Sequence, residues 1–196
     1  MSYTVDWPDA EYHEILPNLY LGGHLWRDGL RDQWGKHSTV STDESWDYVV
    51  SAYFDTKNDS SWPLCDHRLV PFSDTEQGLS DLTWSQIKSA VDAVVRRWLL
   101  GEKVLVRCQA GFNRSGLMMS LILMRLGFTA DVAINRVRRK RSPCVLVNKV
   151  FESYVREREE EYRDPANLVI VVNTIFDGDE EKDVLIRDIF EESKGE

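Results

Sequence analysis

A cysteine and an arginine six positions apart, Cys108 and Arg114, are the residues whose types and spacing best suit chemistry. They stand in the segment VLVRCQAGFNRS, where an apolar β-type run precedes Cys108 and an apolar helical run follows Ser115. Where a strand meets the N-terminus of a helix, unpaired backbone N–H groups and the helix dipole bind anions and favour a thiolate over a thiol. The guanidinium of Arg114 matches two oxygens of a phosphate. A nucleophile and an oxyanion site in one loop predict phosphoryl transfer onto sulfur.

The context of this pair is more specific than its spacing alone. Gly111 lies between the two residues and permits a turn that aims successive N–H groups inward. A free cysteine is commonly a small buried hydrophobic residue, which is the alternative interpretation of Cys108. The β-type run, the glycine and the apolar helix together favour the catalytic interpretation.

Strand and helix patterns alternate around this loop. Short strands are expected in a hairpin at 15–23 that turns at Pro17 and Asn18, and at 48–54, 67–72 and 104–106. Helices are expected at 25–36, at 81–100 between Ser80 as a cap and Gly101 as a stop, and at 117–126, 129–140 and 145–162. These patterns predict an α/β fold: a central, mostly parallel sheet flanked by helices, with the loop between a central strand and a buried helix.

Length and composition favour one globular domain. The chain has 196 residues, and we expect a domain over 1–163 followed by an acidic extension over 164–196, strand-like and then weakly helical. Its three cysteines do not indicate a disulfide framework. No leader or membrane-spanning pattern is present, so we expect no membrane association and a reducing, cytoplasmic location. The sequence gives no indication of an oligomeric state.

Charge is unevenly distributed along the chain. The net charge is -9, yet residues 96–141 carry eleven Lys or Arg against two acidic residues. This basic stretch surrounds Cys108 and suits an anionic substrate. A nucleic-acid partner is not expected, because the acidic molecule as a whole would be repelled by phosphate backbones.

The segment from Cys108 to Gly116 resembles the phosphate-binding loop of the cysteine-dependent protein tyrosine phosphatases, and most closely that of the dual-specificity branch. Three further segments, Ile15–Gly22, Val70–Asp74 and Asn135–Pro143, are similar to this branch's opening strands, to the strand and loop that carry its general acid, and to the helix after its phosphate loop. The resemblance covers about residues 12–160. It implies a dual-specificity-phosphatase-like α/β sandwich, with the phosphatase domain at 1–163.

The resemblance also implies a role for each residue. Cys108 would attack phosphorus, Arg114 would bind the equatorial oxygens, Asp74 would protonate the leaving group, and Ser115 would help the sulfur leave in a second step. No metal or other cofactor is expected, because the loop and Arg114 supply the positive field. The residues expected to bind phosphate are Gln109, Ala110, Gly111, Phe112, Asn113 and Arg114.

Asp74 and Arg107 leave alternatives open. Asp74 stands in a Phe-Ser-Asp-Thr stretch, where an aspartate often bonds only to its own turn, and Glu76 and Asp81 are nearby carboxylates. Arg107 occupies the position where the family usually has histidine. Alternation along a strand predicts that Arg107 points away from the side chain of Cys108, so that it supports the loop rather than the sulfur.

Four consecutive cations, Arg138 to Arg141, end the helix expected at 129–140. They suit a solvated helix terminus that complements the dipole. Alternatively, Arg138 or Arg141 lies beside the pocket and binds a second negative group of the substrate.

The expected function is hydrolysis of phosphotyrosine in proteins, with phosphoserine and phosphothreonine as further substrates, so the expected partner is a phosphorylated protein. One alternative is a phosphatase of non-protein substrates, such as an RNA 5′ end or an inositol phosphate. The neutral loop residues Gln109, Ala110, Phe112 and Asn113 favour the protein substrate. A phosphate-binding pseudophosphatase is another alternative, which the missing histidine favours and the retained Cys108 opposes.

Overall fold

The computed structural model describes residues 8–23, 46–53, 65–75 and 77–167. The helix expected at 25–36 lies outside these residues, as does the acidic extension beyond 167. Where the extension begins, the N–H of Asp164 donates to the carbonyl of Met124, and the Asn167 amide donates to the carbonyl of Arg125. Residues 164–167 therefore pack against the end of the helix that follows the phosphate loop.

A five-stranded sheet forms the centre of the fold, in the order β1-β2-β5-β3-β4. Its first two strands make the predicted antiparallel hairpin, which turns at Asn18 with a φ of 63°. The other neighbouring strands pair in parallel, and β5 lies between β2 and β3. The mostly parallel sheet is confirmed. The strands are β1 (Tyr12–Leu16), β2 (Leu19–Gly23), β3 (Tyr48–Ser51), β4 (Asp66–Leu69) and β5 (Val104–Cys108).

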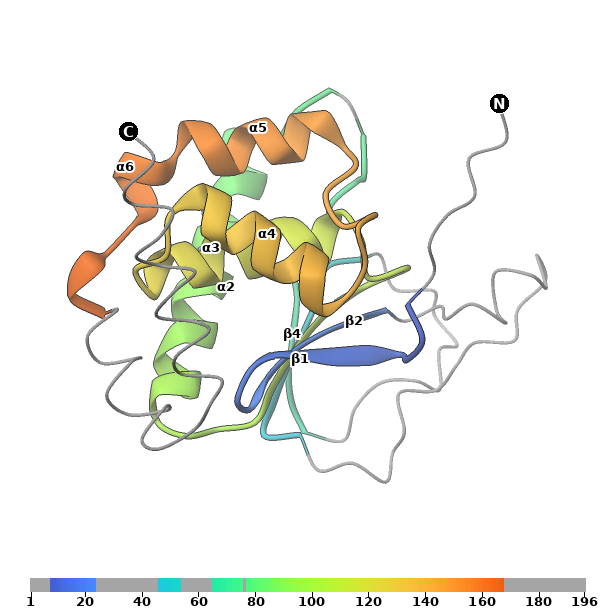
Figure 1. The fold of residues 1–196 in the computed structure, drawn as a ribbon, viewed down its shortest axis with the longest axis vertical. Helices are drawn as coiled ribbons and strands as arrows, with labels where there is room; N and C mark the ends of the chain where they lie inside the picture. Colours follow the sequence, from blue (N-terminus) through green and yellow to red (C-terminus); the bar gives the residue numbers. More distant parts are fainter. Residues whose placement is uncertain (1–7, 24–45, 54–64, 76, 168–196) are drawn as a thin grey trace.

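The described helices lie together on one side of the sheet (Figure 1). They are α2 (Asp81–Leu99), α3 (Arg114–Arg125), α4 (Ala130–Lys140), α5 (Lys149–Glu157) and α6 (Glu159–Tyr162). Helix α3 packs against α2, α4, α5 and β5, and its residues from Arg114 to Met124 are all buried. Its apolar sequence on every side accounts for this central position. No helix in the described part of the chain has the length and apolarity needed to cross a bilayer.

Helices α2 and α4 begin and end within one residue of the prediction, whereas α3 begins at Arg114, three residues before the predicted Leu117. The Ser80 hydroxyl accepts from the N–H of Thr83 and begins α2, and the Thr129 hydroxyl accepts from Val132 and begins α4. Gly101, with a φ of 87°, follows the end of α2.

The prediction of one helix over 145–162 is wrong, because α5 begins only at Lys149. Leu146 has a left-handed backbone with a φ of 58°, which a helix does not accommodate. The side chain of Asn148 then accepts from the N–H groups of Val150 and Phe151 and starts the helix. A second interruption at Arg158 separates α5 from α6. Strands β3 and β4 also end earlier than predicted, at Ser51 and Leu69.

Side chains of β5 alternate between the two faces of the sheet. Val104, Val106 and Cys108 belong to the main core beneath the helices, whereas Leu105 packs with Trp46 and other residues on the opposite face. This alternation places the sulfur of Cys108 on the same side as α3.

Substitution of Gly23 by alanine tests how closely the strands approach the loop. A Cβ at Gly23 would lie 2.9 Å from the carbonyl carbon and oxygen of Ala110, and a backbone cannot yield as a side chain tip does. We expect Gly23→Ala to displace the loop, to lower stability by about 1–3 kcal/mol, and to weaken binding of an inorganic oxyanion such as vanadate.

Gly101→Ala is the matched control for this substitution. Its Cβ would meet nothing within 4 Å, but its φ of 87° makes alanine strained. It should lower stability by about 1–2 kcal/mol and leave vanadate affinity unchanged. Equal vanadate affinity of Gly23→Ala and the parent protein would contradict the close approach.

Candidate active site

Hydrogen-bond donors surround the sulfur of Cys108. The side chain is 2% exposed, and its Sγ accepts from the N–H of Gly111 at 3.2 Å and from the hydroxyl of Ser115 at 3.1 Å. Helix α3 begins at Arg114, so the N–H groups of its first turn have no intrahelical acceptor and open onto the same loop. The sulfur is therefore an acceptor in both of its hydrogen bonds.

Arg114, at the other end of the same loop, is also buried. It is 8% exposed, and its two terminal nitrogens donate to the Phe72 carbonyl and to Gln109 Oε1, both at 3.3 Å. Its Nε has no hydrogen-bond partner among the described residues. A buried N–H without an acceptor costs free energy, and an oxyanion bound in the loop would remove that cost.

Contacts with the core and with Leu146 support the backbone of the loop between Cys108 and Arg114. The Phe112 side chain packs into the core, and its carbonyl accepts from the N–H of Leu146 at 3.3 Å. Gly111 has a φ of 76°, and a Cβ there would lie 2.5 Å from Arg141 Nη2 and 2.7 Å from the backbone of Gly22. Only glycine therefore fits this position.

Arg141 holds the carbonyls of the loop, so the interpretation of it as a solvated helix terminus is wrong. It is 5% exposed and therefore not solvated, and its guanidinium forms hydrogen bonds with groups of this chain. Nε donates to the Gly111 carbonyl at 2.9 Å and Nη2 to the Ala110 carbonyl at 3.4 Å, while Nη1 contacts His13 Nδ1 at 2.9 Å. Burial lowers the pKa of Arg141 to about 10, against the opposing effect of the Cys108 charge, so Arg141 stays cationic at neutral pH.

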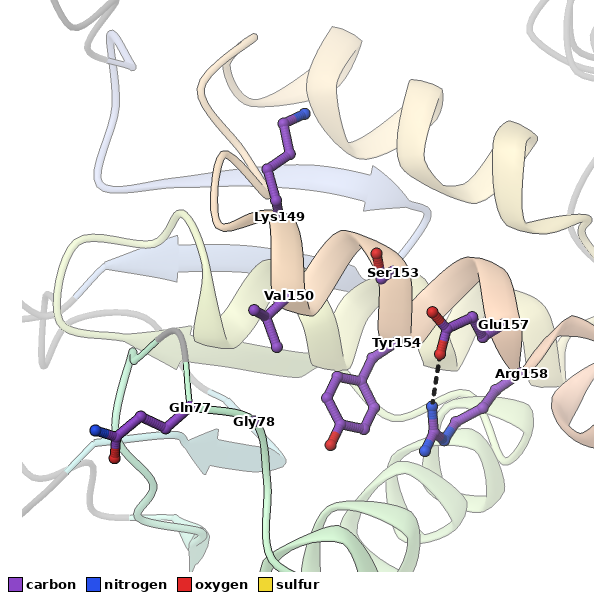
Figure 2. Close-up of a pocket in the computed structure, with 8 residues that line it drawn as sticks. All are labelled: Gln77, Gly78, Lys149, Val150, Ser153, Tyr154, Glu157 and Arg158. Carbon is purple, nitrogen blue, oxygen red and sulfur yellow. Dashed lines mark ion pairs between the residues drawn. The ribbon is translucent and has the colours of Figure 1, made fainter.

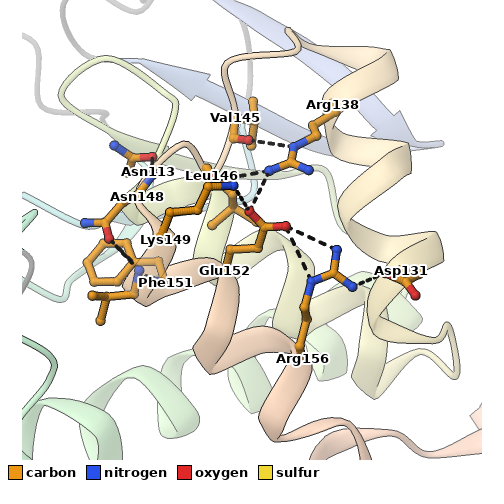
Figure 3. Close-up of polar contacts among 11 residues, drawn as sticks. Asn113, Asp131, Arg138, Val145, Leu146, Asn148, Lys149, Phe151, Glu152 and Arg156 are labelled. Carbon is orange, nitrogen blue, oxygen red and sulfur yellow. Dashed lines mark hydrogen bonds and ion pairs between the residues drawn. The ribbon is translucent and has the colours of Figure 1, made fainter.

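Arg138 also has a structural role, whereas its contact with a substrate stays a prediction. Its Nε donates to the Val145 carbonyl at 3.0 Å, and its Nη2 donates to the Leu146 carbonyl and to Glu152, both at 3.1 Å (Figure 3). These bonds fix the segment that leads into Asn148. They also stabilise the left-handed backbone at Leu146, whose N–H reaches the phosphate loop.

Glu152 also supports the segment before Asn148, because its carboxylate forms ion pairs with several cationic side chains. Besides Arg138, it accepts from Lys149 at 2.9 Å and from Arg156 at 3.1 Å, and Arg156 also pairs with Asp131. Burial alone would raise the pKa of Glu152, but the hydrogen bonds from Lys149, Arg138 and Arg156 more than offset it and lower the pKa to about 2.

Arg107 lies on the sheet face opposite the sulfur, so its predicted orientation is confirmed. It is fully buried, its Nε donates to the Ser51 hydroxyl at 2.9 Å, and its guanidinium lies 5.6 Å from the centre of the Tyr53 ring. These contacts join β5 to β3 and to the residues that follow it. The Ser51 hydroxyl also contacts His67 Nε2 at 2.9 Å.

Asp74 lies at the rim of the phosphate loop. It is exposed in the segment between β4 and α2, and it contacts the amide of Asn113, the residue before Arg114, at 3.0 Å. A second amide, from Asn148, reaches its other oxygen at 2.9 Å. Of the alternatives, Asp81 occupies the first turn of α2, and Glu76 lies outside the described residues.

Asn148 is a site residue that was not among the predicted ones. It joins Asp74, Asn113 and the start of α5. The signal for it was present, because an asparagine directly before an amphipathic run is typical of a helix N-cap.

A comparison with protein-family models matches residues 36–161 to "Dual specificity phosphatase, catalytic domain". That range is well over half of the chain, and it contains the cysteine loop, Asp74 and Asn148. The chain belongs to the dual specificity phosphatase family. A search of curated proteins finds no match.

Several solved structures have a similar fold. Human DUSP28 matches with a TM-score of 0.57 and 20% identity, over 78% of this chain and 95% of that one. Tk-PTP in its active form gives a TM-score of 0.58 and 21% identity, over 78% and 98%. PTPMT1 in complex with PI(5)P gives 0.58 and 17%, over 78% and 97%. At these identities the likeness establishes the dual-specificity-phosphatase-like fold.

Substitution of Arg141 by methionine tests the support behind the loop. Methionine fills the volume but leaves the carbonyls of Ala110 and Gly111 without their donors. We expect weaker vanadate binding and a fall in kcat/KM toward an aryl phosphate of about 100-fold, since the loop must hold the oxyanion in place. Arg139→Met, at an exposed position of the same helix end, should leave both quantities unchanged. A parental kcat/KM in Arg141→Met would contradict this role.

The depressed pKa of Glu152 predicts a loss of stability in acid. Its folded pKa of about 2 is below the ordinary 4.5, so its contribution is complete above about pH 5 and is lost as the pH falls toward 2. Urea unfolding at pH 6 and pH 3 should show a difference between the parent and Glu152→Gln that shrinks by on the order of 2 kcal/mol at the lower pH. Glu157→Gln, in the exposed part of α5, serves as control. A pH-independent difference would contradict the network.

Proposed function

We propose that this protein removes phosphate from phosphotyrosine in proteins, with phosphoserine and phosphothreonine as further substrates, through a cysteinyl-phosphate intermediate. The observation that carries the proposal is found at the two ends of one loop: the Cys108 sulfur accepts two hydrogen bonds, and the buried Nε of Arg114 has no hydrogen-bond partner among the described residues. A loop built to position a nucleophile and an oxyanion together suits the transfer of a phosphoryl group. Because the chain retains both Cys108 and Arg114, catalysis is better supported than phosphate binding alone.

In the first step, the Cys108 thiolate attacks phosphorus in line with the bond to the leaving oxygen. The S–P bond forms as the P–O bond breaks, and Asp74 gives its proton to the departing oxygen. Negative charge on the three remaining oxygens is met by the loop N–H groups and by Arg114 Nε. The positive charge of Arg141 behind the loop adds to the same field.

In the second step, water attacks the cysteinyl-phosphate. The Asp74 carboxylate takes a proton from that water, the S–P bond breaks, and the electron pair returns to sulfur as thiolate. The Ser115 hydroxyl already donates to Sγ at 3.1 Å, so it can stabilise the charge that develops on the sulfur as it leaves. Inorganic phosphate is the product.

A groove beside the Asp74 segment supports a peptide as the rest of the substrate. Its volume is about 490 Å³, and Figure 2 shows its lining residues: Gln77, Gly78, Lys149, Val150, Ser153, Tyr154, Glu157 and Arg158. Of these lining residues, Gln77 follows Asp74 by three positions in the chain, and Lys149 directly follows Asn148. Because Asp74 protonates the leaving oxygen, the leaving group must lie on this side of the loop. An aromatic ring, an aliphatic chain and charges of both signs suit the side chains of a polypeptide.

Two observations favour this substrate over a polyanionic small molecule. PTPMT1, solved in complex with PI(5)P, shares the fold, so an inositol phosphate is the second candidate. However, the guanidinium groups of Arg138 and Arg141 are occupied by backbone carbonyls of this chain. The loop side chains between Cys108 and Arg114 are neutral. A substrate with several phosphates would therefore gain little from these residues.

The cysteines are consistent with a cytoplasmic location for this activity. Cys65, Cys108 and Cys144 are all free thiols. A reducing compartment keeps such thiols available, and the proposed nucleophile requires that state.

Substitution of Cys108 by serine tests the proposed chemistry. The hydroxyl is not ionised at neutral pH, so Cys108→Ser should lower kcat toward a phosphotyrosine peptide by at least about 1,000-fold. The variant should still bind the peptide. Acid quench of the parent enzyme during turnover should trap phosphate on Cys108, detected by mass spectrometry of the peptide that contains it. Turnover by Cys108→Ser at the parental rate would overturn the proposal.

A substrate panel separates the two candidate substrates. The parent enzyme should show a higher kcat/KM toward a phosphotyrosine peptide than toward PI(5)P in vesicles or an RNA with a 5′-triphosphate. A higher value for either non-protein substrate would assign the activity to that class instead.

A further inference from the structure

Asp74 is an exposed side chain in an irregular segment, yet both of its carboxylate oxygens are held. Asn113 Nδ2 donates to Oδ2 at 3.0 Å, and Asn148 Nδ2 donates to Oδ1 at 2.9 Å. An exposed aspartate in a loop ordinarily exchanges between rotamers within nanoseconds. Two amides from different parts of the chain restrict it to one orientation.

The orientation of each amide is itself fixed. The Asn113 Oδ1 accepts from the backbone N–H of Asn148 at 3.0 Å, and the Asn148 Oδ1 accepts from the N–H groups of Val150 and Phe151. Figure 3 shows Asn113 and Asn148 side by side at the start of α5. Because each carbonyl oxygen already accepts from an N–H group, each NH₂ group must face Asp74.

The backbone on either side of Asp74 is hydrogen-bonded to the side chains of Asn148 and Arg114. Asn148 Nδ2 also donates to the carbonyl of Thr75 at 3.3 Å, and Arg114 Nη1 donates to the carbonyl of Phe72 at 3.3 Å. The segment that carries Asp74 is thus bonded on both sides of the carboxylate, once to the phosphate loop and once to the cap of α5.

We infer that Asn113 and Asn148 are positioning residues that aim the carboxyl group of Asp74 at the leaving oxygen. This inference rests on the proposed phosphatase function, in which Asp74 is the general acid. An NH₂ group only donates, so it leaves a lone pair free on each carboxylate oxygen and does not compete for the transferred proton. Asn113 directly precedes Arg114, so the residue next to the oxyanion site also orients the acid.

The dependence of rate on the leaving group tests this role. Protonation matters for a basic leaving group, such as the phenolate of phenyl phosphate or of phosphotyrosine, and hardly at all for 2,4-dinitrophenolate. In Asn113→Ala, kcat/KM toward phenyl phosphate should fall about 10- to 100-fold, whereas kcat/KM toward 2,4-dinitrophenyl phosphate should fall less than about 3-fold. Inhibition by vanadate should stay within about 3-fold of the parent, because the phosphate loop is intact.

Further variants show whether a loss of rate comes from the missing amide or from a change in folding. Asn148→Ser retains a good helix cap but loses the amide, and it should show the same selective loss. In an Asp74→Asn background, Asn113→Ala should add no further loss, since the acid that it positions is already absent. Asn135→Ala, at an exposed position of α4, should match the parent throughout.

Equal losses on both substrates, together with weaker vanadate inhibition, would overturn the positioning role and make Asn113 a support of the loop. Unchanged rates on both substrates would overturn it as well. In either case, turnover by the parent enzyme would leave the proposed function standing. Failure of the parent to hydrolyse either substrate would instead overturn the proposed function, and the positioning role with it.

Discussion

Donation of hydrogen bonds to one sulfur, that of Cys108, is the interaction on which the rest of the structure depends. A loop that turns its N–H groups toward an anion must turn carbonyls the other way, and buried carbonyls need donors. Arg141 supplies them to Ala110 and Gly111, and Leu146 supplies one to Phe112. The anion site in front of the loop and the donors behind it are therefore two consequences of one backbone conformation.

Helix α3 and the segment between α4 and α5 keep the hydrogen-bond donors around the loop in place. Apolar burial fixes α3, whose first turn opens onto the sulfur. The segment after α4 has little regular structure, so Arg138 and Glu152 hold it through carbonyls and ion pairs. That segment ends at Asn148, which contacts Asp74. A chain of polar contacts thus runs from behind the phosphate loop to the acid at its rim, with an apolar core beneath it.

The sequence predicts the parts of this site that are encoded locally. The strand, turn glycine and apolar helix around Cys108 are contiguous, so their pattern locates the loop, and alternation along β5 correctly turns Arg107 away from the sulfur. The supports come from distant positions. Arg141 is 30 residues from Gly111, and nothing local distinguishes a buried cation from a solvated helix end. The start of α5 is a different case, because its N-cap signal at Asn148 is local, while a contact from Arg138 stabilises the left-handed backbone at Leu146.

A crystal structure with bound vanadate tests the central claim most directly. We expect vanadium bonded to Cys108 Sγ, equatorial oxygens accepting from the loop N–H groups and from Arg114 Nε, and the apical oxygen within hydrogen-bond distance of Asp74. Arg141 should keep its bonds to the loop carbonyls. Vanadate bound elsewhere, or an Arg114 Nε that still lacks an acceptor when the loop is occupied, would contradict the account.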